Sequence, residues 1–203
     1  MKTIAMLPGH AAKKDGATVC AGYYKGWGEF KLGSLYIPEL CRWLEKEGFI
    51  TKQTKRESKG GTSPSYSAKA ANATKADIAL EWHFNDYNAL SDGCTVLYYA
   101  EVANPVGKQF AEKLGERIAK ILGVRHRGAL PIKGEADPLK GESDRGWYAF
   151  KNSAMPFFMI EPCFAGSNAR EAREFCAKIK TGEFAKKAAE AVAATINEVY
   201  GKD

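Results

Sequence analysis

Three residues that can bind a metal or transfer a proton stand close to the ends of apolar runs in the sequence. His10 follows the run 2–7, His83 lies near the end of the run 78–84, and Glu161 lies near the end of MPFFMIEP. Short apolar runs of this kind are typical of buried strands. A histidine at the end of such a strand is a packed core residue, a metal ligand or a catalytic base. Two of the chain's three histidines occupy such positions, which favours a functional site.

Imidazoles and carboxylates are the ligands that a catalytic zinc ion prefers. Such an ion has three protein ligands and keeps a fourth position for water. A further carboxylate that does not bind the metal then accepts a proton from that water. The strand ends supply two histidines and one carboxylate, whereas this chemistry requires three ligands and a separate carboxylate base. The pattern alone therefore leaves the third ligand open.

The other potentially reactive side chains are weaker candidates. The five cysteines are odd in number and contain no C-x-x-C pair, which argues against a disulfide framework and a cysteine zinc site. Cys163 follows Glu161 closely, but reactive thiols usually need a helix N-terminus or a cationic neighbour. We therefore predict that Cys163 is buried and inert, and that His126 is a solvated loop residue.

Strand-like and helix-like segments alternate along the chain. We predict strands at 2–7, 49–54, 78–84, 95–99 and 155–162, and helices at 35–47, 67–75, 107–122, 169–180 and 183–200. Because Pro38 lies inside the first helical pattern, that helix either starts there or is kinked. The segment 123–145 is irregular. This alternation predicts an α/β fold: a three-layer sandwich with a largely parallel central sheet flanked by helices on both faces. Functional groups gather at the carboxyl ends of the strands in such sheets.

Length and composition are those of an ordinary globular domain. The chain has 203 residues, of which 45% are hydrophobic, and a net charge of +6 that attracts anionic polymers such as nucleic acid, membrane surface or cell wall. The lysines are scattered among glutamates and no nucleic-acid-binding motif occurs, so we predict no nucleic-acid partner. No apolar run approaches the ~20 residues of a membrane span, and the N-terminal run is too short for a signal peptide. We predict synthesis in the cytoplasm without a signal peptide and no stable membrane insertion.

Five blocks of sequence carry a resemblance to a known family. They are LPGH at 7–10, Glu29 in GWGEF, NATKAD at 72–77, WHFN at 82–85, and MIEPCF at 159–164 followed by Ser167 and Asn168. In this order they resemble the zinc-dependent N-acetylmuramoyl-L-alanine amidases of the amidase type 3 family, which are found in bacterial autolysins and phage endolysins. The resemblance covers nearly the whole chain.

The resemblance implies a role for each matching residue. His10, Glu29 and His83 are expected to bind Zn²⁺, and Glu161 is expected to be the catalytic base. The implied activity is hydrolysis of the amide bond between N-acetylmuramic acid and L-alanine in peptidoglycan. Asn85 is either a turn former or a substrate contact, and Trp27, shortly before Glu29, is a candidate for lining a sugar- or peptide-binding cleft.

The sequence departs from the family pattern in ways that leave every ligand in place. The aspartate that precedes Pro-Gly-His in the family, an acceptor that would orient a ligand imidazole, is Leu7 here, and the serine two residues before the last histidine ligand is Glu81. Residues i and i+2 of a strand share a face. We therefore expect that Glu81 can supply the missing carboxylate near His83. Cys163 also stands where the family has glycine.

We expect residues 1–203 to form a single catalytic amidase domain without a separate cell-wall-binding domain. Peptidoglycan is the expected partner, the expected state is a monomer, and the expected role is that of a phage or prophage endolysin that acts on a Gram-negative wall, in the periplasm or from the exterior, after release from the cytoplasm. Two alternatives stay open at this point. One is a zinc carboxypeptidase that trims the stem peptide, and the other is a non-catalytic module that binds cell wall or nucleic acid.

Overall fold

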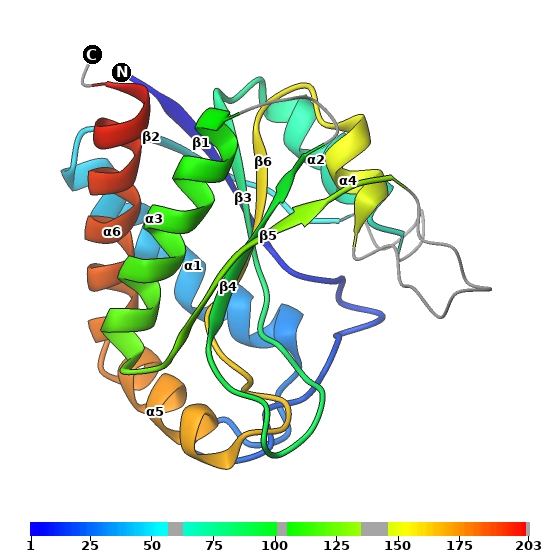
Figure 1. Cartoon of the computed structure of the whole chain (residues 1–203), viewed down its shortest axis with the longest axis vertical. Helices are drawn as coiled ribbons and strands as arrows, with labels where there is room; N and C mark the ends of the chain where they lie inside the picture. Colours follow the sequence, from blue (N-terminus) through cyan, green and yellow to red (C-terminus); the bar gives the residue numbers. More distant parts are fainter. Residues whose placement is uncertain (57–62, 101–104, 135–145, 202–203) are drawn as a thin grey trace.

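The computed structural model describes residues 1–56, 63–100, 105–134 and 146–201 (Figure 1). The strands within these ranges are β1 (Thr3–Pro8), β2 (Ile50–Gln53), β3 (Ile78–Trp82), β4 (Cys94–Tyr99), β5 (His126–Ile132) and β6 (Phe157–Glu161). The helices are α1 (Glu29–Lys46), α2 (Ser65–Thr74), α3 (Pro105–Leu122), α4 (Trp147–Asn152), α5 (Ala169–Lys180) and α6 (Glu183–Tyr200).

The strands form one six-stranded sheet in the order β2-β1-β3-β6-β4-β5. Neighbouring strands are parallel except β4 and β6, which pair antiparallel, so β4 and β5 run opposite to the other four strands. The carboxyl ends of β1, β3 and β6 therefore meet at the same edge of the sheet. The predicted α/β fold with a largely parallel sheet is confirmed.

Helices cover both faces of the sheet, which confirms the predicted three-layer sandwich (Figure 1). Side chains alternate between the two faces along each strand. In β3, Leu80 and Trp82 pack in the core cluster that α1, α3, α5 and α6 complete, whereas Ala79 packs in the cluster that α2 and α4 complete. Glu81 thus lies on the α2 side of the sheet.

The edge strand β5 lies in a segment that the sequence pattern indicates to be irregular, so that prediction is wrong for His126–Ile132. Ile132 is the one residue of β5 that is fully buried. Gly128 and Pro131 interrupt its pattern, and proline is tolerated in edge strands because one row of their N–H groups needs no partner in the sheet. The short helix α4 was also not predicted from the sequence.

Helix α1 begins at Glu29, earlier than the predicted start at residue 35 or at Pro38. Pro38 lies in its interior, since the helix continues to Lys46. The early start matters because it places Glu29 in the first turn of the helix, at the end that faces the carboxyl edge of β1.

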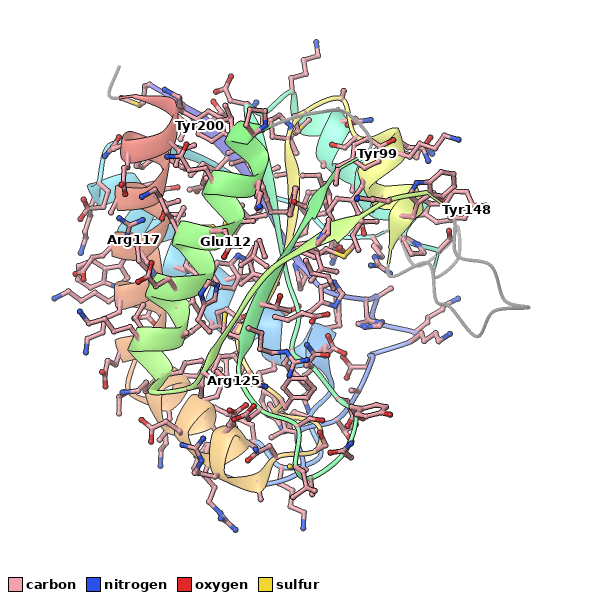
Figure 2. All side chains as sticks on the ribbon, in the orientation of Figure 1. Tyr99, Glu112, Arg117, Arg125, Tyr148 and Tyr200 are labelled. Atoms are coloured by element: carbon pink, nitrogen blue, oxygen red, sulfur yellow. The ribbon has the colours of Figure 1, made fainter. Side chains whose placement is uncertain are left out.

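Two contacts fix the outer helices and the chain ends. Arg117 of α3, which is labelled in Figure 2, donates hydrogen bonds to Thr195 and Glu198 of α6, at 2.9 and 2.6 Å. Lys2 Nζ donates to the backbone carbonyl of Gly201 at 3.3 Å, so the two ends of the described chain lie together, before the amino end of β1.

Among the helices of the described ranges, none has both the length and the apolar character needed to cross a membrane.

The core between α1, α5, α6 and the sheet contains a cluster of aromatic rings. The fully buried Phe184 lies with its ring centroid 4.8 Å from that of Phe175, 5.3 Å from Tyr36 and 6.0 Å from Trp82. Trp82 is the last residue of β3, next to His83, so this cluster also fixes the strand end that carries the histidine.

We expect Phe184→Ala to lower the free energy of unfolding by about 3–5 kcal/mol, because the substitution opens a cavity among rings that cannot collapse into it. Equilibrium unfolding in urea measures the change. Tyr87→Ala, at a side chain that is 80% exposed, is the control and should change the free energy by less than about 0.5 kcal/mol. Equal losses in the two variants would contradict this account of the core.

Candidate metal centre

Three elements deliver His10, Glu29 and His83 to one point at the carboxyl edge of the sheet. His10 follows the end of β1, His83 directly follows β3, and Glu29 is the first residue of α1. Because β1 and β3 are parallel neighbours, the segments that leave them emerge side by side. The N-terminus of α1 is a favourable place for a carboxylate, since the helix dipole attracts negative charge there.

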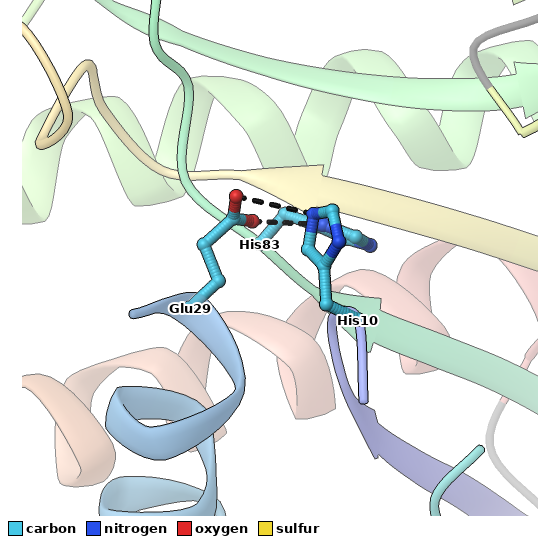
Figure 3. A group of neighbouring side chains, drawn as sticks. All are labelled: His10, Glu29 and His83. Atoms are coloured by element: carbon cyan, nitrogen blue, oxygen red, sulfur yellow. Dashed lines mark hydrogen bonds and ion pairs between the residues drawn. The ribbon is translucent and has the colours of Figure 1, made fainter. Parts of the chain in front are cut away.

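The carboxylate of Glu29 lies beside the two neighbouring imidazoles and directs one oxygen at each of them (Figure 3). Its Oε1 is 3.2 Å from His10 Nε2, and its Oε2 is 2.9 Å from His83 Nδ1. When one ligand atom is taken from each residue, a nitrogen from each histidine and one oxygen from Glu29, the three atoms lie within 4.8 Å of one another. The group therefore has the spacing of a metal site with three protein ligands.

Backbone groups hold the Glu29 carboxylate in this position. The N–H of Ala17 donates to Oε1 at 3.0 Å and the N–H of Phe84 donates to Oε2 at 3.2 Å. The side chain is only 5% exposed. Each oxygen thus has one backbone donor and one imidazole neighbour, and the carboxylate is oriented before any ligand binds.

The turn between β1 and His10 is shaped by a close approach to His83. His10 has a φ of 60°, in the left-handed region that non-glycine residues rarely adopt. A Cβ atom added to Gly9 would lie 2.5 Å from His83 Nδ1, so only glycine fits there. Unusual backbone of this kind is found at functional sites, where the surrounding structure compensates its cost.

The charges of the site are strongly coupled. Burial alone would raise the pKa of Glu29, but hydrogen bonds with His10 and His83 outweigh burial and lower that pKa to about 2. Burial alone would lower the pKa of His83, but the neighbouring carboxylates of Glu29 and Glu81 outweigh burial and raise it to about 10. Without a metal, the His83 ring is therefore in its positively charged, protonated form at neutral pH, with one carboxylate beside each ring nitrogen. A metal ligand must be deprotonated, so metal binding at His83 releases that proton.

Glu161 lies beside this group without belonging to it. As the last residue of β6, Glu161 lines a cavity of about 350 Å³ together with His10, His83 and Asn85. The side-chain amide of Asn85 donates a hydrogen bond to Glu161 Oε2. The cavity thus holds two imidazoles of the metal group and a separate carboxylate, which is the arrangement that metal-assisted hydrolysis requires.

Glu81 lies behind His83, away from Glu29. It is completely buried, and its Oε2 is 3.3 Å from His83 Nε2. Its Oε1 accepts hydrogen bonds from Arg56 and Ser67. Sequence reasoning missed these two residues, because Arg56 follows the short strand β2 and Ser67 lies in an alanine-rich helix, where neither type carries a recognisable pattern.

Trp27 does not line the cavity that contains Glu161 and the histidines. Its indole packs against Tyr24, with ring centroids 5.0 Å apart, and Lys31 Nζ lies 4.0 Å from the indole centroid. The proposed contact between Trp27 and substrate stays a prediction.

Cys163 and His126 lie apart from the metal group. Cys163 is fully buried, and burial, with the nearby Glu171 charge, raises the pKa of its thiol well above the usual range, as expected of an inert cysteine. The prediction of a solvated loop for His126 is wrong: His126 is the first residue of β5, and its Nε2 lies 3.6 Å from Glu112 Oε2 on α3. It was misassigned because the edge strand has no continuous apolar run.

Comparison with protein families shows that residues 4–198 match the family model described as N-acetylmuramoyl-L-alanine amidase. Comparison with curated proteins gave no match. Several solved structures have the same fold. Cwp6 from Clostridium difficile has a TM-score of 0.72 at 20% identity, covering 98% of this chain, and this chain spans only 29% of the Cwp6 chain.

Two further structures match along nearly their whole length. The catalytic domain of the CD27L endolysin targeting Clostridia difficile has a TM-score of 0.71 at 22% identity, covering 95% of this chain and 97% of that chain. The amidase AmiC2 of Nostoc punctiforme has a TM-score of 0.69 at 20% identity, covering 99% of this chain and 98% of that chain. At these identities the structures show the fold alone.

We expect Gly9→Ala to weaken metal binding, because the new methyl group would displace the His83 ring from Glu29. Titration with a divalent metal against a competing chelator measures the affinity. Gly123→Ala is the control: Gly123 also occurs in a turn, with a φ of 64°, and has open space around it. That variant should lose stability through backbone strain but keep its metal affinity, and an unchanged affinity in Gly9→Ala would contradict the proposed geometry.

Proposed function

Because the chain belongs to the N-acetylmuramoyl-L-alanine amidase family, we propose that it hydrolyses the amide bond between N-acetylmuramic acid and L-alanine in peptidoglycan, with Zn²⁺ bound by His10, Glu29 and His83. The observation that carries this proposal is the convergence of these three side chains beside a separate carboxylate, Glu161, at one cavity.

The donor set fits zinc. Two imidazole nitrogens and one carboxylate oxygen are a common ligand set of catalytic zinc, with bonds of about 2.0–2.2 Å. Tetrahedral bonds of that length place neighbouring ligand atoms about 3.3–3.6 Å apart. Each Glu29 oxygen lies close to this distance from one imidazole nitrogen, Oε1 at 3.2 Å from His10 and Oε2 at 2.9 Å from His83, and one ligand atom from each of the three residues lies within 4.8 Å of the others.

Zinc at such a site supplies Lewis-acid polarisation of a carbonyl and lowers the pKa of a water molecule to about 7. The residues around it do the rest. Glu29 contributes a negative charge at neutral pH, since its pKa is far below the usual range. The two histidines contribute neutral nitrogen ligands once His83 has lost its proton.

Glu161 is the group that moves the proton in this mechanism. Its carboxylate accepts the proton of the attacking water and then passes it to the nitrogen of the leaving L-alanine, so the peptide departs with a neutral amine. The amide of Asn85 donates to Oε2 and so fixes the orientation of this carboxylate. Glu161 lies at the wall of the cavity and is held by the neutral amide of Asn85. Its carboxylate can therefore accept and release a proton while its position stays fixed.

Two alternatives are distinguished by their products. A zinc carboxypeptidase with the same ligands would release an amino acid from the end of the stem peptide, whereas an amidase releases the whole peptide with a free L-alanine amine. A non-catalytic wall-binding module would need neither the metal group nor Glu161. The family match favours the amidase.

We propose a role in lysis, as a phage or prophage endolysin, on the likeness to the catalytic domain of the CD27L endolysin. The net charge of +6 would draw the protein to anionic wall polymers, an attraction that salt weakens. Three further expectations stay predictions: that the protein is a monomer, that it acts on the wall after release, and that it has no nucleic-acid partner.

We expect purified peptidoglycan to be solubilised by the protein, with new free amines on L-alanine. A chelator should abolish this activity and added Zn²⁺ should restore it, because the ligands themselves cannot activate water. Mass spectrometry of the products identifies the new termini. Release of a terminal D-amino acid would instead indicate the carboxypeptidase, and full activity in excess chelator would contradict the zinc mechanism.

We expect Glu161→Gln to lower kcat by about 10²- to 10⁴-fold, the usual contribution of a general base, while zinc content stays near one per chain. Glu29→Gln is the matched control, since it makes the same chemical change at a proposed ligand and should lower the zinc content itself. Activity assays and metal analysis of the two variants separate the roles. Loss of zinc from Glu161→Gln would show that Glu161 is a ligand and not the base.

A further inference from the structure

A buried network on the α2 side of the sheet touches the proposed metal site from behind. Glu81 is 0% exposed, Ser67 is 0% exposed and Arg56 is 5% exposed. They come from β3, α2 and the segment after β2, so three separate parts of the chain meet at one carboxylate. We propose that Glu81, held by Arg56 and Ser67, is a positioning residue that keeps the proton of His83 on Nε2 and leaves Nδ1 to the metal. This inference rests on the proposed zinc site.

The hydrogen bonds fix one oxygen of Glu81 firmly. Ser67 Oγ donates to Oε1 at 2.6 Å, and Arg56 donates to the same oxygen from Nε at 3.2 Å and from Nη2 at 3.1 Å. Arg56 Nε also donates to Ser67 Oγ at 2.5 Å. Burying a carboxylate is costly unless it is paired with a cation and hydrogen-bonded. The network meets both conditions at Oε1 and so fixes the orientation of the whole carboxylate.

The second oxygen of Glu81 is thereby directed at His83. Oε2 lies 3.3 Å from Nε2, longer than the usual 2.9–3.0 Å of an N–H···O bond, and the approach lacks the alignment of a full hydrogen bond. Both atoms are buried without another hydrogen bond among the described residues.

The two nitrogens of His83 therefore face two different carboxylates. Nδ1 faces Glu29, the proposed fellow ligand, at 2.9 Å, and Nε2 faces Glu81. An imidazole that binds a metal through one nitrogen can carry a proton only on the other nitrogen, away from the metal. An acceptor beside Nε2 favours that form, as carboxylates do behind many metal-binding histidines. Without Glu81, the form with its proton on Nδ1 could donate to Glu29 and compete with the metal.

The position of Glu81 in the sheet explains how the carboxylate reaches this place. Glu81 pairs with Leu7 across the parallel strands β3 and β1, and both side chains lie on the α2 face. Leu7 itself packs in the apolar cluster on that face and offers no acceptor. Glu81 is thus the carboxylate of this face that contacts a proposed ligand.

The first test measures zinc affinity in Glu81→Gln by competition with a chelator. We expect a loss of about 10- to 100-fold, the usual effect of removing such a partner. Glu171→Gln is the matched control: Glu171 is 1% exposed and accepts hydrogen bonds from the backbone N–H groups of Gly93 and Phe164, away from the ligands. The control should lose stability but keep its zinc affinity. Equal affinities in Glu81→Gln and the wild type, or equal losses in both variants, would overturn the proposal.

The second test needs no substitution, so it stands even if Glu81→Gln fails to fold. Long-range ¹H–¹⁵N NMR spectra of the zinc-loaded wild-type protein, labelled at histidine, report which ring nitrogen carries the proton. We expect His83 to show a protonated Nε2 and a metal-bound Nδ1. A protonated Nδ1 with zinc on Nε2 would overturn the inference. A wild-type protein that binds no zinc would overturn both this inference and the proposed mechanism, whereas unaltered affinity in Glu81→Gln would overturn this inference alone.

Discussion

The carboxylate of Glu29 is the group on which the site depends. It is buried at the first turn of α1 and contacts one imidazole with each oxygen. A carboxylate in such a place is stable only if its charge is matched, and here two histidines and two backbone N–H groups supply the match. The start of α1, the turn after β1 and the end of β3 are therefore held together by one charge.

The sheet provides the frame for this contact. The strands β1, β3 and β6 are parallel neighbours, so His10, His83 and Glu161 leave the same edge in the order of the strands. The reversal of β4 brings its first residues to that edge as well, and Thr95 pairs with Glu161. The aromatic rings beneath Trp82 keep the end of β3 in place. The packing of the aromatic core therefore also determines the position of His83, the proposed ligand that follows β3.

Much of this could be predicted from the sequence, for identifiable reasons. The buried strands are continuous apolar runs, so their ends, and with them His10, His83 and Glu161, could be located. The edge strand β5 could not, because its residues are half exposed and it contains Gly128 and Pro131. Glu29 came only from the family resemblance, since no local pattern shows that a helix begins beside two strand ends. Arg56 and Ser67 were missed because their role depends entirely on the side chain that they meet in space.

Lys2 and Gly201 lie on the opposite side of the molecule from the chemistry. Lys2 and Gly201 are joined by a hydrogen bond before the amino end of β1, while His10 follows its carboxyl end. A solid support attached near Lys2 or Gly201 would therefore leave the cavity facing away from that support. This geometry makes the protein suitable for immobilisation on a bead or sensor, where a large polymeric substrate must approach from the free side.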